Sequence, residues 1–152
     1  MNKYEHIFFD LDHTLWDFKT NSRNALGQLH EEFILLRSPK LKFNDFYYRY
    51  VEVNDHWWQQ YRMGKVGKQD LRGGRFRDTL QHFGITDEVL TETLAHEYTA
   101  RSPYQTTLFP GAIETLETLV KRGHILHIIT NGFEEVQHIK LNESKLRTYF
   151  DQ

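Results

Sequence analysis

Two short apolar runs, far apart in the chain, most constrain the fold that this sequence can adopt. They are residues 7–9 and 125–129, separated by residues 10–124. Each run is continuous rather than alternating, which is typical of parallel strands covered on both faces. Each run also ends abruptly at polar residues. We therefore expect two buried parallel strands, formed by distant parts of the chain.

Helical patterns accompany the second run. Apolar residues at spacings of three and four over residues 113–120 predict a helix that begins after Pro110–Gly111. It ends at residues 121–123, where two cations and a glycine follow one another. A further helix is expected from 134 to about 145, because its two leading acids suit a helix N-terminus. The order strand, helix, strand, helix predicts an α/β fold.

The segment between the two runs has a different, aromatic-rich character. Helical spacing of apolar residues predicts four helices within it, over residues 21–36, 43–61, 70–83 and 87–100. The second of these is expected to be interrupted at Asn54. A helical insert between two strands predicts a cap domain over residues 17–103. The α/β core then consists of residues 1–16 and 104–152.

Composition excludes several kinds of site. The chain has no cysteine, so disulfides, thiolate zinc sites and cysteine nucleophiles are excluded. Its net charge of −2 lacks the basic footprint of proteins that bind nucleic acid polymers. We find neither the apolar stretch of a signal peptide nor that of a membrane helix, and therefore expect a cytoplasmic protein without a membrane partner. At 39% hydrophobic residues, the chain is expected to need a partner or further sequence to complete its core.

Two carboxylates follow the first run. Asp10 and Asp12 are spaced i and i+2, so in an extended segment they point the same way from the end of the strand. Open α/β sheets bind their ligands at this end. Adjacent carboxylates repel each other unless a cation such as Mg²⁺ intervenes. One could then act as a nucleophile and the other as a general acid/base, the alternative being two loop aspartates that cap a turn.

A hydroxyl and backbone amides follow the second run. Thr130, Asn131 and Gly132 lie between the second strand and the next expected helix. A hydroxyl at a strand end, followed by N–H groups at a helix start, can bind an anion. The alternative is an ordinary turn, for which Thr-Asn-Gly is also suited.

Together the two groups resemble the haloacid dehalogenase superfamily over essentially the whole chain. Residues 6–15, HIFFDLDHTL, are similar to its first motif, and residues 125–132, ILHIITNG, to its second. The resemblance implies a partial Rossmann-like α/β core with a helical cap of the first cap class. It also implies that Asp10 attacks phosphorus to form an aspartyl-phosphate. Asp12 would protonate the leaving oxygen and then activate water.

The same resemblance implies the binding residues. The Asp10 side chain and the Asp12 backbone carbonyl would hold Mg²⁺. Phosphate oxygens would be bound by Leu11, Thr130, Asn131 and Gly132. Because halide departure needs no proton donor, an acid at position 12 favours a phosphatase over a true dehalogenase.

Three further segments are similar to the branch of the family that hydrolyses pyrimidine and non-canonical nucleoside 5'-monophosphates. They are residues 108–119, LFPGAIETLETL; residues 128–133, IITNGF; and residues 146–151, LRTYFD. The resemblance implies a small phosphomonoester substrate, a nucleotide. Two alternatives stay open: another small substrate such as a sugar phosphate, and a non-catalytic module that binds phosphate or a nucleotide.

Four residues of the insert are candidates for substrate contact. Trp57, Trp58 and Tyr61 could stack on a base. Arg75 could reach a phosphate or a base oxygen. The alternative is that they belong to the core, since an aromatic stripe at helical spacing usually does.

Two motifs of the family are absent from the sequence. The family needs a lysine after a later strand and one or two acids that complete the Mg²⁺ site. Lys140 and Lys145 lie in the helix directly after Thr130, which is not the place of that lysine. We therefore interpret the chain as the first part of a phosphatase, either a fragment of a longer protein or a truncated product, and expect little or no turnover from it alone. The unfinished sheet also predicts self-association.

Overall fold

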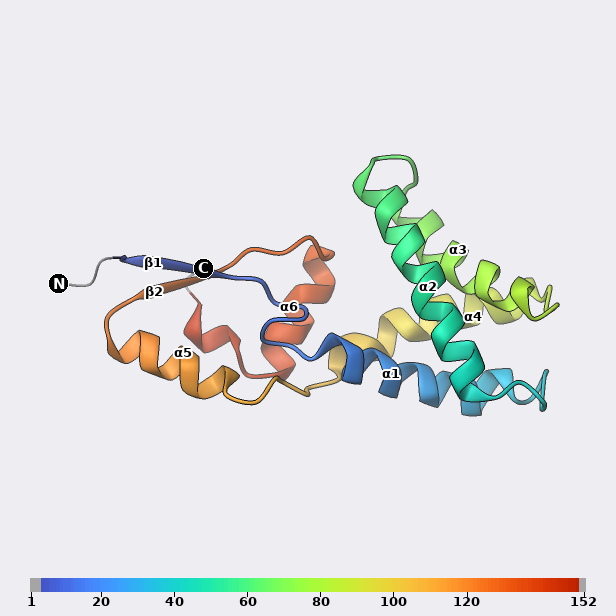
Figure 1. The fold of residues 1–152 in the computed structure, drawn as a ribbon, viewed down its shortest axis with the longest axis horizontal. Coiled ribbons are helices and arrows are strands. Elements are labelled where there is room, and N and C mark those ends of the chain that lie inside the picture. Colours follow the sequence, from blue (N-terminus) through green and yellow to red (C-terminus); the bar gives the residue numbers. More distant parts are fainter. Residues whose placement is uncertain (1–3, 151–152) are drawn as a thin grey trace. The chain divides into compact units, whose positions relative to one another are not determined.

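In the computed structural model, which describes residues 4–150, the chain forms two compact units (Figure 1). The first comprises the described residues of Met1–Asn24 and Arg101–Gln152, and the second is Ala25–Ala100. The insert expected over residues 17–103 includes the whole second unit, and its role as a cap stays a prediction. Asp151, at the end of the segment 146–151, lies outside the described residues.

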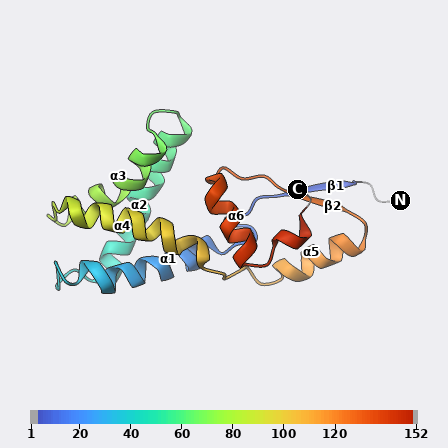
Figure 2. The same cartoon turned by 180° about the vertical axis from the view of Figure 1, so that it is seen from behind.

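The first unit contains the expected pair of strands. Strand β1, His6–Phe9, pairs in parallel with β2, Ile125–Ile128, so that Phe9 lies opposite Ile128. Figures 1 and 2 show the two strands side by side from opposite directions. The unit also contains the helices α5 (Ala112–Lys121) and α6 (Glu134–Glu143) and the 3-10 turns Ser102–Tyr104 and Arg147–Tyr149. The prediction of a partial α/β core is confirmed.

Only one face of this sheet is covered within the part of the chain that the structure describes. Leu126 is buried with Leu116 of α5 and Leu141 of α6. By contrast, Phe8 is 62% exposed and Ile129 is 64% exposed. The expectation of strands covered on both faces is therefore wrong for these residues. Side chains alternate along a strand, and the described helices pack against one of the two resulting faces.

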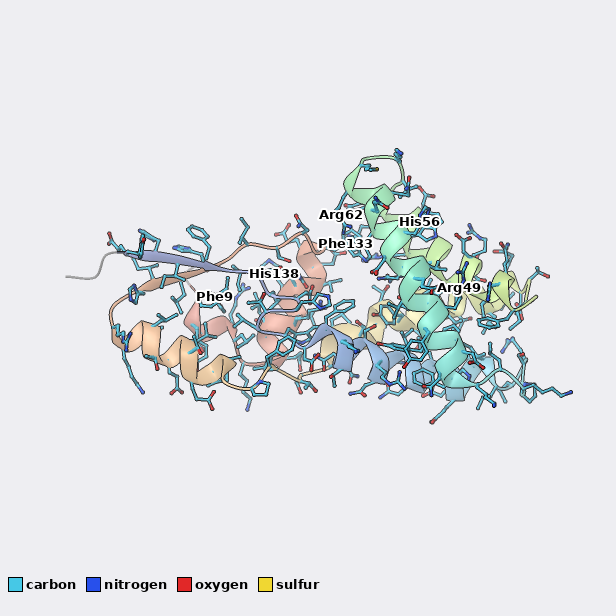
Figure 3. All side chains as sticks on the ribbon, in the orientation of Figure 1. Phe9, Arg49, His56, Arg62, Phe133 and His138 are labelled. Carbon is cyan, nitrogen blue, oxygen red and sulfur yellow. The ribbon has the colours of Figure 1, made fainter. Side chains whose placement is uncertain are left out.

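The second unit is helical. Its elements are α1 (Phe18–Leu29, which begins in the first unit), a π-helical turn (His30–Ile34), α2 (Phe43–Arg62), α3 (Lys68–His82) and α4 (Glu88–Arg101). Labelled side chains along α2 in Figure 3 include Arg49, His56 and Arg62. The expected interruption at Asn54 is wrong, because α2 continues through it. The Asn54 side chain is buried and accepts a hydrogen bond from Arg75 Nη1 at 3.1 Å, so a polar position on the helix faces inward.

Among residues 4–150, no helix combines the length and the apolar character needed to cross a membrane.

Candidate active site

Parallel pairing brings the two polar groups singled out in the sequence to the same edge of the sheet. Asp10 directly follows β1, and Thr130 comes two residues after β2. The Ile129 backbone N–H donates to the Phe9 carbonyl at 2.9 Å, which extends the pairing to the point where both strands end. The six candidate residues of the first unit therefore lie at one sheet edge: Asp10, Leu11, Asp12, Thr130, Asn131 and Gly132.

A tight turn shapes the segment after β1. The Leu11 carbonyl accepts hydrogen bonds from the N–H groups of Leu15 at 3.0 Å and Trp16 at 2.9 Å. Both the Leu11 and Trp16 side chains are fully buried, which anchors the turn in the core. His13 adopts a left-handed backbone with φ of 64°, which a histidine tolerates better than most residues. The buried anchors hold the backbone from which Asp10 and Asp12 project.

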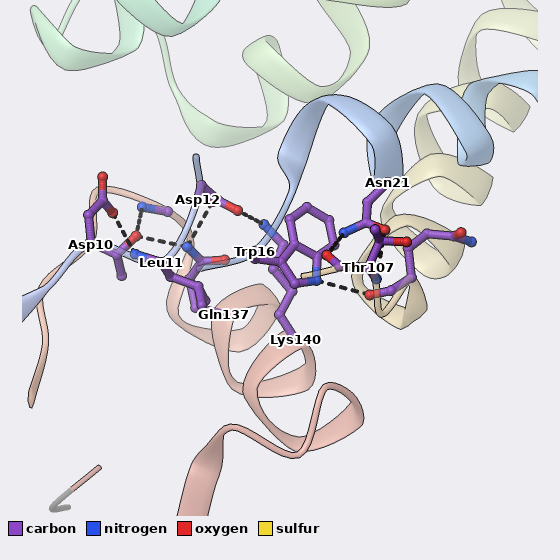
Figure 4. Close-up of polar contacts among 11 residues, drawn as sticks. Asp10, Leu11, Asp12, Trp16, Asn21, Thr107, Gln137 and Lys140 are labelled. Carbon is purple, nitrogen blue, oxygen red and sulfur yellow. Dashed lines mark hydrogen bonds and ion pairs between the residues drawn. The ribbon is translucent and has the colours of Figure 1, made fainter. Parts of the chain in front are cut away.

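Asp10 is exposed at the sheet edge. Its Oδ1 accepts a hydrogen bond from the Leu11 backbone N–H at 2.8 Å (Figure 4). The expected contact of Leu11 with phosphate stays a prediction. A carboxylate so exposed is accessible to a ligand.

Asp12 has a different environment, with a side chain only 21% exposed. Its Oδ1 accepts a hydrogen bond from Lys140 Nζ at 2.7 Å, and its Oδ2 accepts one from Gln137 Nε2 at 3.0 Å (Figure 4). The two neighbouring carboxylates therefore differ in exposure and in hydrogen-bond partners. Asp10 faces solvent, whereas the orientation of Asp12 is determined by two donors on α6.

Lys140 is buried, with 4% of its side chain exposed. Its Nζ lies 4.1 Å from the ring centroid of Trp16, so the cation contacts both a carboxylate and an aromatic face. Burial lowers the pKa of the Lys140 ammonium, and the adjacent Asp12 carboxylate opposes this shift. Sequence analysis assigned Lys140 no role in the site, and the structure corrects this by placing it against Asp12.

Gln137 is the other residue that sequence analysis missed. Its Nε2 donates to Asp12 Oδ2 and also to Thr130 Oγ1, the latter at 2.8 Å. A Cβ at Gly132 would overlap the Gln137 side chain, so the glycine leaves the room that Gln137 occupies. One signal could have found these residues: positions 137 and 140 are spaced i and i+3, hence on one face of the helix that follows Thr130.

The four candidates in the insert belong to the second unit. Trp57 Nε1 donates to Asp78 Oδ2 at 2.8 Å. The rings of Trp58 and Tyr61 meet edge to face, with centroids 5.7 Å apart. Arg75 is 6% exposed, and its guanidinium carbon lies 4.8 Å from the ring centroid of Tyr98. Arg75 thus lies in the interior of the unit, as the core alternative expects, and substrate contact by any of the four stays a prediction.

The oxygen donors at the sheet edge fit part of a magnesium site. No cluster of three or more His, Cys, Asp or Glu side chains suited to a metal ion occurs within residues 4–150. Mg²⁺, however, is commonly held by one or two protein carboxylates, with water and phosphate completing its six ligands. The Asp12 carboxylate is occupied by Lys140 and Gln137. The exposed Asp10 carboxylate is therefore the accessible side-chain donor, and a role for the Asp12 backbone carbonyl stays a prediction.

The chain is similar to known hydrolases. The family model described as haloacid dehalogenase-like hydrolase matches residues 4–152. Pyrimidine 5'-nucleotidase PynA from Streptococcus pneumoniae is 34% identical over 149 residues, covering 98% of this chain and 60% of that protein. Pyrimidine 5'-nucleotidase YjjG from Escherichia coli is 31% identical over 150 residues, covering 98% of this chain and 61% of that protein.

A solved structure shows the same fold. The HAD-hydrolase YfnB from Bacillus subtilis, solved with bound magnesium, superposes with a TM-score of 0.85 at 25% identity. The match covers 99% of this chain and 64% of that one. The chain spans about 60% of the length of the curated relatives described above. Because the family match extends over nearly all of its residues, the chain belongs to the haloacid dehalogenase-like hydrolases.

Proposed function

We propose that this chain carries the nucleophile and the general acid/base of a Mg²⁺-dependent phosphatase that hydrolyses small phosphomonoesters. One observation carries the proposal: Asp10 and Asp12 follow β1 at the sheet edge where Thr130 follows β2. A nucleophile, a second acid and a hydroxyl donor then converge on one place. These groups could supply the nucleophile, the general acid/base and one phosphate contact for phosphoryl transfer through a covalent intermediate.

The different environments of the two acids suit different roles. Asp10 is exposed and would attack phosphorus, forming an aspartyl-phosphate while the P–O bond to the leaving group breaks. Asp12 would donate a proton to the leaving oxygen and later accept one from the attacking water. Thr130 would donate a hydrogen bond to a phosphate oxygen.

The Asp10 carboxylate and the Asp12 backbone carbonyl would hold Mg²⁺. When bound, the metal supplies positive charge that offsets the charge developing on the phosphoryl oxygens. Within the described residues, Lys140 already pairs with Asp12, and no third acid joins the site. Since phosphoryl transfer depends mostly on positioned charge, we propose that residues 1–152 alone turn over slowly.

Nucleoside 5'-monophosphates are the proposed substrates. The support is that two relatives more than 30% identical to this chain are pyrimidine 5'-nucleotidases. A panel of phosphate esters tests this part. Release of phosphate from pyrimidine nucleotides ahead of sugar phosphates supports it, and the reverse order favours the sugar phosphate alternative.

The test of the chemistry is detection of the covalent intermediate. The purified chain is incubated with Mg²⁺ and a phosphomonoester, trapped with borohydride and mapped by mass spectrometry. Modification at Asp10 supports the proposal, and its loss is expected in Asp10→Asn. A matched control is Asp55→Asn, an exposed aspartate of α2, which should leave trapping unchanged. Phosphate binding that survives Asp10→Asn, with no intermediate in the wild type, would instead establish the non-catalytic binding module.

A further inference from the structure

The Thr130 hydroxyl has both of its acceptor positions filled. It accepts a hydrogen bond from Gln137 Nε2 at 2.8 Å and another from the Gly132 backbone N–H at 3.1 Å. A hydroxyl offers two lone pairs and one O–H. With both lone pairs used, the remaining interaction of Thr130 is donation of its proton.

The negative charge of the Asp12 carboxylate determines the orientation of the Gln137 side-chain amide. Its nitrogen donates to the Asp12 carboxylate and to Thr130, whereas its buried Oε1 has no hydrogen-bond partner within residues 4–150. Flipping the amide would turn Oε1 towards the Asp12 carboxylate, placing two acceptors against each other. The nitrogen contacts therefore determine the orientation, even though they leave a buried oxygen unpaired.

Asp12 is in turn held from its other side. Lys140 Nζ contacts Asp12 Oδ1 at 2.7 Å, which leaves Oδ2 for Gln137. The contacts form a chain that runs from Lys140 through Asp12 and Gln137 to Thr130. Asp12 accepts from both Lys140 and Gln137, and the Gln137 nitrogen donates to both Asp12 and Thr130. The end of this chain is a hydroxyl whose proton is free to point to a ligand.

We propose that Gln137 is a positioning residue that orients the Thr130 hydroxyl as a donor for an anionic oxygen. The inference rests on the proposed function, because the anion in question is the phosphoryl group. A cation, or a ligand group that can only donate a hydrogen bond, would find no acceptor at this hydroxyl. Gln137 also couples the two strand ends, since it bonds to Asp12 after β1 and to Thr130 after β2.

The experiment combines a ligand-free measurement with phosphate binding. In the ¹⁵N-labelled chain, the Gln137 side-chain amide is assigned by its loss in Gln137→Met, a neutral change of similar volume. We expect its protons to exchange slowly in the wild type and faster in Thr130→Val. Inorganic phosphate is then titrated by calorimetry with Mg²⁺ present. We expect Gln137→Met to weaken phosphate binding by roughly fivefold, the order of one hydrogen bond.

A double-mutant cycle separates positioning from packing. In a Thr130→Val background, Gln137→Met should change phosphate affinity by less than about twofold, because no hydroxyl remains to be oriented. The matched control is Asn142→Leu, which removes an exposed amide of the same helix and should leave affinity unchanged.

Each result has one meaning. Equal phosphate affinity of the wild type and Gln137→Met overturns the inference and leaves the proposed function intact. An amide of Gln137 that exchanges as fast as exposed amides also overturns the inference, whatever the phosphate affinity. A wild type that binds no phosphate overturns the proposed function, and the inference with it. Slow exchange with a fivefold loss that requires Thr130 supports both.

Discussion

Replacing Asp12 with asparagine should destabilise the first unit, whereas the same change at Asp10 should not. Asp12 accepts one hydrogen bond on each carboxylate oxygen, from Lys140 and from Gln137. An asparagine keeps one acceptor and turns its NH₂ group to the second donor. One contact is then lost, and two donors face each other in a partly buried place.

The expected loss is about 2 kcal/mol of unfolding free energy. Hydrogen bonds to charged groups contribute about 1.5–3 kcal/mol each. Removing one partner of a fully buried ion pair costs about 3–5 kcal/mol. Because the Asp12 side chain keeps 21% exposure, solvent screens the unpaired Lys140, and the lower range applies. Within residues 4–150, the Asp10 carboxylate accepts its hydrogen bond from the adjacent Leu11 N–H, which an amide oxygen can also accept, so a loss of less than about 0.5 kcal/mol is expected.

Urea unfolding followed by tryptophan fluorescence measures the difference. Trp16 is fully buried in the first unit and lies 4.1 Å from Lys140 Nζ, so it reports on the right place. The chain has three tryptophans, so replacing Trp57 and Trp58 by phenylalanine in all variants leaves Trp16 as the only fluorescent tryptophan.

Equal stability of the two variants would refute the reasoning. It would mean that the contact between Lys140 and Asp12 contributes no more than an exposed surface pair, for which about 0–1 kcal/mol is typical. The Asp12→Asn, Lys140→Met double variant adds a second check. Its destabilisation should be smaller than the sum of the two single changes, since they share one interaction.

Three further predictions concern stability. Lys145→Gly should stabilise the chain by about 0.5–1 kcal/mol in urea unfolding, because Lys145, two residues after the end of α6, has a φ of 58°. Gly74→Ala should lower the melting temperature and the free energy of unfolding by about 1–3 kcal/mol, because the added Cβ would overlap the Trp57 indole. In a helix without such a contact, the same change usually stabilises. Hydrogen bonds from the first turn of the following helix lower the pKa of the Asp17 and Asp87 carboxyls. Their contribution is therefore present above the unfolded pKa near 3.8 and is lost as pH falls through the lowered folded pKa. Asp17→Asn and Asp87→Asn should therefore flatten the loss of stability below about pH 5.

Local rules were sufficient for the framework of the molecule. The two continuous apolar runs became the parallel strands. Helical spacing and leading acids placed the described α-helices to within a few residues, except that α1 ends at Leu29, where a π-helical turn follows, and not at residue 36. The candidate chemistry was readable for the same reason. Asp10, Asp12 and Thr130 follow strand ends, and parallel strands end at one edge of a sheet. Periodicity and strand polarity are properties of neighbouring residues, so the chain alone carries them.

Contacts between distant residues required the tertiary structure. The sequence contains Asn54 as a polar break in an aromatic stripe, and the fold turns it into a buried acceptor for Arg75. Such pairings depend on which faces of two helices meet, which no local pattern encodes.

The same holds at the site. Lys140 and Gln137 read as ordinary polar residues of a helix, yet the fold places them against Asp12, 128 and 125 positions earlier in the chain. The sequence by itself therefore determined which residues end the strands and could carry the chemistry. Only the tertiary structure decided which partners orient them, because those partners lie on another element that meets the strand ends only through packing.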